Sequence, residues 1–175
     1  AQGGNYNLTT TTLTANVTIL NITATANDKQ YDRTNVATVS LVGVIGGDSV
    51  ASPSAVFDTA SIGTNKTVTI TGTISGTDSE NYNLTTTTLT ASITKRWVSL
   101  TFNAPSKQYD GTTTVELSLV SIDNVLPGDK VYLSSFTSRF NNASVGTNKL
   151  VLIENIVITG EDMSTYIGIT SMTMS

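Results

Sequence analysis

Hydrophobic and polar side chains alternate along much of this chain. In residues 115–119 every second side chain is apolar, and the same period recurs at residues 37–41, at 68–70 and at 20–24, which we match to 98–102. A period of two is that of half-buried β-strands, and no window shows a convincing helical period. Gly-Asp and Gly-Thr-Asn-Lys sequences separate the strands as turns. We therefore predict an all-β chain of short strands, which is typical of a sandwich.

One predicted strand changes phase in its middle. Tyr82 and Leu84 share one parity, whereas Leu89 and Ile93 lie on the other. A strand that keeps its apolar side chains on one face must therefore bulge or bend within residues 85–88. The alternative is that this threonine run is simply exposed and tolerant of substitution.

A long motif occurs twice. The sequence NYNLTTTTLTANVT at residues 5–18 returns as NYNLTTTTLTASIT at residues 81–94, with twelve of fourteen letters matching at an offset of 76. Lys-Gln-Tyr-Asp, Gly-Asp and Gly-Thr-Asn-Lys also return in the same order, and their offsets rise in small steps to 83. Small loop insertions within one shared fold produce such steps, so the chain is expected to contain repeated domains.

The repeats divide the chain into three parts. Residues 19–95 and 96–175 are expected to form two complete β domains of about 80 residues each. Residues 1–18 are then the last strand of a preceding repeat, or a strand donated to another molecule. An unpaired strand with an apolar face is an adhesive edge, because it can add to the open edge of a neighbouring sheet.

Composition excludes several classes of function. The chain has no Cys and no His, which removes disulfides, thiol nucleophiles, His general bases and the usual zinc sites. Charged residues make up 13% and the net charge is −4, so a nucleic-acid partner is not expected. The sequence contains no run of 18 apolar residues, so membrane insertion is not expected. Thr is the commonest residue, with 33 of 175, and β-branched side chains favour sheets.

The acidic residues do not predict catalysis. No carboxylate pair is placed beside an activating base, so we do not expect an enzyme. Calcium at a turn or a domain junction is conceivable, although no EF-hand spacing is present and solvated turn acids are the simpler interpretation, so we expect no cofactor. The turn acids concerned are Asp48, Asp78, Glu80, Asp129 and Asp162.

Each repeat carries a Tyr at a fixed distance after an acidic turn residue. Asp78-x-x-x-Tyr82 and Asp162-x-x-x-Tyr166 both stand before a further strand segment. This spacing resembles the tyrosine corner of immunoglobulin-like sandwiches, in which a Tyr hydroxyl bonds back to the chain. The alternative is a Tyr that stacks on a ligand. We predict two tandem Ig-like β-sandwich modules arranged end to end, with β-grasp-like modules as the alternative.

A second recurring motif predicts a tight turn. In Tyr109-Asp110-Gly111-Thr112 the Asp can accept a bond from the backbone two residues on, and Gly permits a positive φ. The first copy has Arg33 after Tyr31 and Asp32. An Arg at this position means that φ is not positive there or that the turn is strained.

The ordered set of motifs resembles a known family. KQYDGTTTV, a PGD or GGD turn, VGTNK and a D-x-x-x-Y strand together resemble the YDG repeat domains of large bacterial surface proteins and adhesins. The resemblance covers residues 17–175. It departs at Arg33 and at Tyr166-Ile167-Gly168-Ile169, where the Asn-Leu and threonine run are missing. The resemblance implies an extracellular spacer at the bacterial cell surface and supplies no host or surface ligand.

The junction between the two domains is short. Only Lys95, Arg96 and Trp97 separate Thr94 from the next strand, which is under way by Val98. Without a Gly, Ser or Pro linker few torsions are free, so we predict a stiff pair. Trp97 is expected to pack in the seam or, alternatively, to be partly buried in its own domain.

Three functions follow as expectations. The first is a non-catalytic stalk of an extracellular bacterial adhesin, whose partners are neighbouring repeats of the same chain. The second is a filament subunit that self-associates by donor-strand exchange through residues 1–18. The third is a glycan- or protein-binding module, for which the sequence shows no aromatic cluster.

Overall fold

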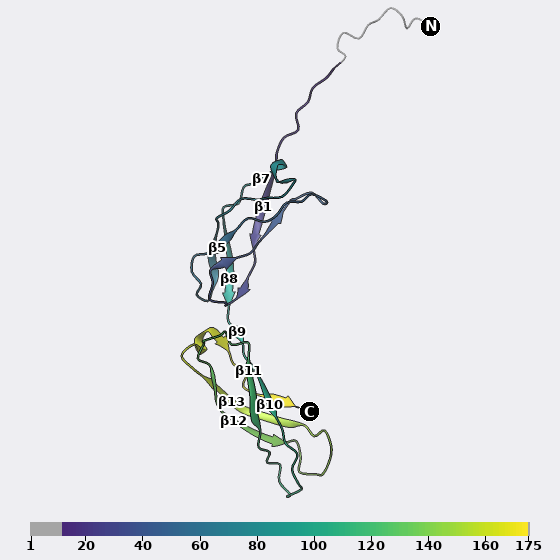
Figure 1. Ribbon diagram of the computed structural model, residues 1–175, viewed down its shortest axis with the longest axis vertical. Helices are drawn as coiled ribbons and strands as arrows, with labels where there is room; N and C mark the ends of the chain where they lie inside the picture. The colour runs from purple at the N-terminus through teal and green to yellow at the C-terminus, as the bar shows by residue number, and fades with distance from the viewer. Residues whose placement is uncertain (1–11, 175) are drawn as a thin grey trace, which may run out of the picture.

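The computed structural model describes residues 12–174. It consists of two β modules that follow one another along an elongated molecule (Figure 1). The only helical pieces in the described chain are two 3-10 turns, Ser79–Asn81 and Met163–Thr165. The prediction of an all-β chain is therefore confirmed. No helix among the described residues has the length and apolar character needed to cross a membrane.

The first module has two sheets. One has the strand order β4-β1-β7 and the other has the order β2-β8-β6-β5-β3. The strands are β1 (Leu20–Ala26), β2 (Lys29–Gln30), β3 (Val36–Ala37), β4 (Val39–Val42), β5 (Ala55–Phe57), β6 (Gly63–Ile70), β7 (Tyr82–Leu84) and β8 (Thr88–Thr94).

The chain bends where the hydrophobic phase changes. β7 pairs in parallel with β1 in one sheet, whereas β8 pairs antiparallel with β6 in the other. Residues 85–87 belong to neither strand and carry the chain between the sheets. The predicted bend is therefore present, and it lets Tyr82 and Ile93 both face the interior despite their opposite parity.

The second module is built on the same plan with fewer pairings. Its ladders are β10-β11, β9-β14 and β12-β13-β15. The strands are β9 (Arg96–Trp97), β10 (Ser99–Asn103), β11 (Ser118–Asp123), β12 (Tyr132–Phe140), β13 (Val151–Thr159), β14 (Tyr166–Ile167) and β15 (Met172–Met174).

One match made from the sequence is two residues out of register. β1 pairs with β7 so that Leu20 lies opposite Tyr82, and β9 pairs with β14 so that Arg96 lies opposite Tyr166. Because Tyr82 and Tyr166 are equivalent, Leu20 corresponds to Arg96 and not to Val98. The offset of 76 therefore runs unbroken from the NYNL motif into the first long strand of each module. The alternation alone could not reveal this, because a shift of two keeps every side chain on its face.

Each module has its own core. Phe57, Val68 and Ile93 are fully buried in the first, together with four alanines from both of its sheets. Val98, Ile153 and Tyr166 are fully buried in the second. Every one of these side chains lies on the inward parity of its strand, as burial of one sheet face requires. The two cores share no residue, so each module encloses its own apolar interior.

Candidate functional site

The Tyr of the D-x-x-x-Y motif bonds to a distant turn. The Tyr82 hydroxyl accepts a hydrogen bond from the backbone N–H of Ile45 at 3.1 Å and donates one to the carboxylate of Asp48. That bond to Asp48 is the main reason that the pKa of Tyr82 is raised. Asp78 holds the same turn, because its Oδ2 accepts from Ser49 N–H at 2.7 Å. The motif therefore fastens the end of the module to its Gly-Asp turn.

The second module repeats this arrangement. The Tyr166 hydroxyl accepts from Leu126 N–H at 2.9 Å and donates to Asp129, while Asp162 accepts from Lys130 N–H at 2.8 Å. A tyrosine corner bonds only a few residues back along the chain. Here Tyr166 bonds the carboxylate of Asp129, 37 residues upstream, so the D-x-x-x-Y motif closes a long loop of the module.

The YDG turn has the same hydrogen bonds in both modules. Asp110 Oδ1 accepts from Lys107 Nζ at 2.8 Å and from Thr112 N–H at 2.9 Å. These bonds, that from Lys107 first, lower the pKa of Asp110 to about 2. In the first module burial opposes ionisation of Asp32, but bonds from Lys29 and Thr34 outweigh it and lower that pKa as well.

These carboxylates make the turns sensitive to acid. Because the folded pKa of Asp110 lies near 2 and its ordinary value is 3.8, the stabilising effect is complete above pH 3.8 and is lost as the pH falls through about 2. We expect Asp110→Asn to make unfolding depend less steeply on pH in this window. Circular dichroism melts at several pH values will measure it. An unchanged slope would contradict the assignment, and Asp123→Asn, whose carboxylate lies outside the YDG turn, is the control.

Arg33 adopts the backbone conformation of the glycine that it replaces. Its φ is +68° and that of Gly111 in the second copy is +76°. The left-handed conformation of a non-Gly residue costs about 1–3 kcal/mol. Of the two alternatives for Arg33, a φ that is not positive or a strained turn, the structure therefore has the strained turn. The Arg33 side chain reaches the other module, where it donates to Pro127 O at 2.8 Å and forms an ion pair with the buried carboxylate of Asp129.

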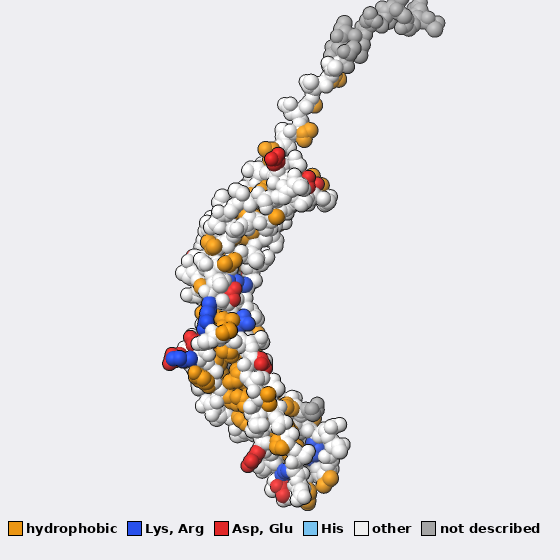
Figure 2. Space-filling model, in the orientation of Figure 1, with side chains coloured by type: hydrophobic (Ala, Val, Ile, Leu, Met, Phe, Trp, Pro, Cys, Tyr) orange, Lys and Arg blue, Asp and Glu red, His pale blue; other side chains and the backbone are white. Residues whose placement is uncertain are grey.

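A second arginine contacts both modules. Arg96 Nη1 donates to Tyr31 O at 3.3 Å in the first module, and its Nε donates to Asn124 O at 3.1 Å in the second. Figure 2 shows Lys and Arg side chains gathered at the junction between the two modules. The Trp97 side chain is 55% exposed and therefore partly buried, and its packing in the seam stays a prediction. Val98 takes the inward position of this strand, so the alternation directs Trp97 outward; Lys95 is exposed as well.

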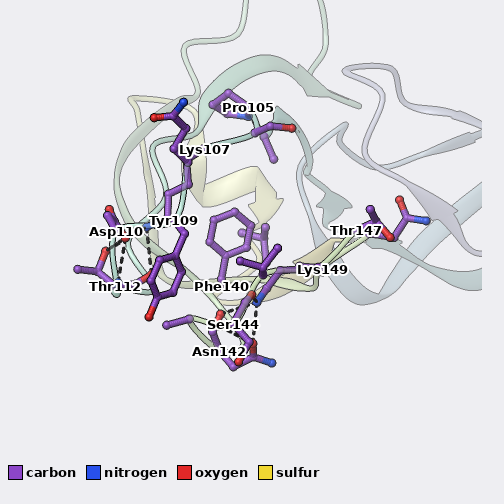
Figure 3. Close-up of a pocket in the computed structure, with 18 of the residues that line it drawn as sticks. Pro105, Lys107, Tyr109, Asp110, Thr112, Phe140, Asn142, Ser144, Thr147 and Lys149 are labelled. Carbon is purple, nitrogen blue, oxygen red and sulfur yellow. Dashed lines mark hydrogen bonds and ion pairs between the residues drawn. The ribbon is translucent and has the colours of Figure 1, made fainter.

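The second module has an open groove of about 640 Å³ at its end. Residues 103–110 line one side and residues 142–149 line the other. Phe140 forms part of its floor, and the ammonium groups of Lys107 and Lys149 each lie 5.9 Å from the centre of its ring. Lys149 also donates to Asn142 Oδ1 at 2.6 Å (Figure 3). Sequence reasoning did not find this groove.

Comparison with known families identifies the repeats. A model of the YDG domain family matches residues 13–89 and 94–174. The chain belongs to the YDG domain family. Each match covers most of one YDG domain, including its YDG turn and its Gly-Asp turn. No curated protein and no solved structure matched the chain.

Four of the turn acids in these YDG domains bond to neighbouring groups. Asp48, Asp78, Asp129 and Asp162 accept the backbone, hydroxyl and guanidinium bonds described above. Among residues 12–174 no three acidic side chains gather as a calcium site would require. The candidate sites among the described residues are the junction bridged by Arg33 and Arg96 and the groove at the end of the second module.

Proposed function

We propose that this chain is a non-catalytic spacer of an extracellular bacterial adhesin, in which YDG domains project a binding region from the cell surface. The observation that carries the proposal is the junction. β8 ends at Thr94 and β9 begins at Arg96, so Lys95 is the only residue between the last strand of one domain and the first of the next. A connection this short leaves few free torsions between the domains.

The arginine contacts add a second constraint on the junction. Arg33 is held in a strained conformation by its own turn, and its side chain spans to Asp129. The Asp129 side chain is nearly inaccessible to water, so its ion pair with Arg33 is screened less than a surface pair. Arg96 supplies a further bond to each domain. These contacts resist bending, which is the property that a spacer needs.

The stiffness of the junction is directly measurable. We expect the 175-residue chain to scatter as a rod, and Arg33→Gly combined with Arg96→Ala to widen the distribution of interdomain distances. Small-angle scattering with residual dipolar couplings will compare the two proteins. Gly is native at the equivalent position 111, so Arg33→Gly removes the contact without harming the turn.

A matched control separates the junction from general effects of charge. Arg139→Ala also removes an exposed arginine paired to a carboxylate, Glu154, but within the second domain. It should leave the distance distribution unchanged. A flexible wild-type pair, or equal flexibility in wild type and the double variant, would overturn the proposal.

A further inference from the structure

The two repeats differ at both ends of one contact across the junction. The YDG turn has Arg33 in the first copy and Gly111 in the second, and the Gly-Asp turn has Gly46 in the first copy and Pro127 in the second. Arg33 Nη1 donates to the carbonyl oxygen of Pro127 at 2.8 Å, although the two residues are 94 apart in the sequence. Two departures from the shared pattern therefore meet in space, which indicates that they act together.

The Gly-Asp turn of the second domain holds the Pro127 carbonyl in place. Asp129 N–H donates to Leu126 O at 3.0 Å, and Gly128 between them has a φ of +89°. These are the features of a type II turn, which favours proline at its second position because the ring fixes φ at about −65°. Pro127 therefore restricts this turn to one conformation, and with it the oxygen that accepts from the other domain.

The carboxylate of Asp129 is the second acceptor at this turn. One of its oxygens accepts from the Tyr166 hydroxyl, and the other forms the ion pair with Arg33. The hydroxyl is itself held by the N–H of Leu126 at 2.9 Å, and the Asp129 side chain is only 3% exposed. The carboxylate is therefore fixed within its own domain, with one oxygen directed at the junction.

The two acceptors match the shape of a guanidinium group. Nη1 of Arg33 donates to Pro127 O, and Nη2 of the same planar group pairs with Asp129 Oδ1. A guanidinium presents its donors in a fixed fork, whereas an ammonium is a point charge on a flexible stem. A carbonyl and a carboxylate that are placed for two nitrogens of one group therefore favour arginine over lysine.

The position that supplies this arginine is otherwise suited to glycine. Arg33 has a φ of +68°, and the hydrogen bonds of the YDG turn are the same as in the copy with Gly111. Bonds within the turn therefore do not explain why a strained residue stands there. The contact with the second domain is one that glycine could not make, because glycine has no side chain, and it offsets the strain of Arg33.

Neighbouring cations do not take the place of Arg33. Lys130 follows Asp129 in the sequence, but its ammonium group pairs with Glu161 at 2.8 Å. Arg96 directs its bonds to the carbonyl oxygens of Tyr31 and Asn124. Among residues 12–174, Arg33 is the one cation that forms an ion pair with Asp129. Removal of its side chain therefore leaves both acceptors of the turn without their ligand.

We propose that the turn at residues 126–129 is a guanidinium-binding site, which recognises the preceding YDG domain by an arginine at the glycine position of its YDG turn. A YDG domain with glycine at that position, as at Gly111, cannot supply the ligand. This one position therefore selects which pairs of YDG domains form the contact. The inference goes beyond the proposed spacer role, because recognition at this site does not require a stiff junction.

Chemical rescue of the intact chain with Arg33→Gly tests the site. The turn tolerates this change, because glycine is native at the equivalent position 111. Added methylguanidinium should occupy the site and cause saturable changes in the amide ¹H and ¹⁵N resonances of Gly128 and Asp129. The free compound should bind weakly, because the chain does not hold it near the site as it holds Arg33. Methylammonium has the same charge without the fork, so it should bind at least about tenfold more weakly.

Two proteins serve as matched controls. In the wild-type chain Arg33 already fills the site, so methylguanidinium should leave these resonances unchanged. In Arg33→Gly combined with Asp129→Asn the Tyr166 hydroxyl keeps an acceptor, but the charge is lost and binding should weaken at least about tenfold. No saturable change in Arg33→Gly, the same change in the wild type, or equal binding of the two compounds would show that this turn is not a guanidinium site. The expected binding together with a flexible wild-type junction would support the site and contradict the spacer role alone.

Discussion

Gly160→Ala is expected to destabilise the second domain by more than about 3 kcal/mol. A Cβ at this position would overlap the carbonyl oxygen of Lys130, and the glycine has a φ of +143°. The overlap is with backbone, which cannot move aside as a flexible side chain would. The approach is close because Asp162 binds the N–H of Lys130 and draws the two segments together. Gly76→Ala should act in the same way on the first domain, against the carbonyl of Ser49.

Urea unfolding followed by circular dichroism will measure both substitutions. Trp97, the only tryptophan, lies at the start of the second domain, so its fluorescence assigns a change to that domain. Gly46→Ala is the control, because no atom lies within 4 Å of the position that its Cβ would take and the expected change is below about 0.5 kcal/mol. Near-native stability of Gly160→Ala would contradict the close approach of these segments.

Phe57→Ala is expected to destabilise the first domain by about 3–5 kcal/mol, because it leaves a cavity in a closed core. The equivalent Phe140→Ala should have a smaller effect, since Phe140 borders the open groove and water can fill the space that it leaves. The pair therefore compares one side chain in a domain that is closed by β8 and in one that is not.

Denaturant unfolding of both variants at low protein concentration will give the difference. Hydrogen exchange with mass spectrometry will assign each transition to its domain. Tyr82→Phe and Tyr166→Phe provide the matched control, because both tyrosines are buried away from the groove, make equivalent hydrogen bonds and should respond alike. A loss for Phe140→Ala equal to that for Phe57→Ala would mean that the groove is closed in solution.

The strands of this protein could be predicted largely from the sequence. The period of two located most of them, and the phase change between Leu84 and Leu89 located the crossing between sheets. Both signals are local, because every second side chain of a strand must face the core. The alternation did not fix how β1 aligns with β9–β10, because a shift of two residues gives the same pattern. Only the pairing of Leu20 with Tyr82 fixed that alignment.

The functional features were far less predictable. The motif D-x-x-x-Y predicted a bond back to the chain, but its partners Asp48 and Asp129 lie more than 30 residues away. The sequence marked Arg33 as unusual in its turn without indicating that its side chain crosses to Asp129. Such contacts depend on how two loops are brought together by packing, and no local pattern encodes that distance.

By itself the sequence determined an all-β chain, its repeated turns and its membership of a repeating family, because alternation and turn chemistry act over a few residues. Only the tertiary structure decided which groups the tyrosines bond and which arginines join the domains. Those outcomes depend on segments far apart in the chain.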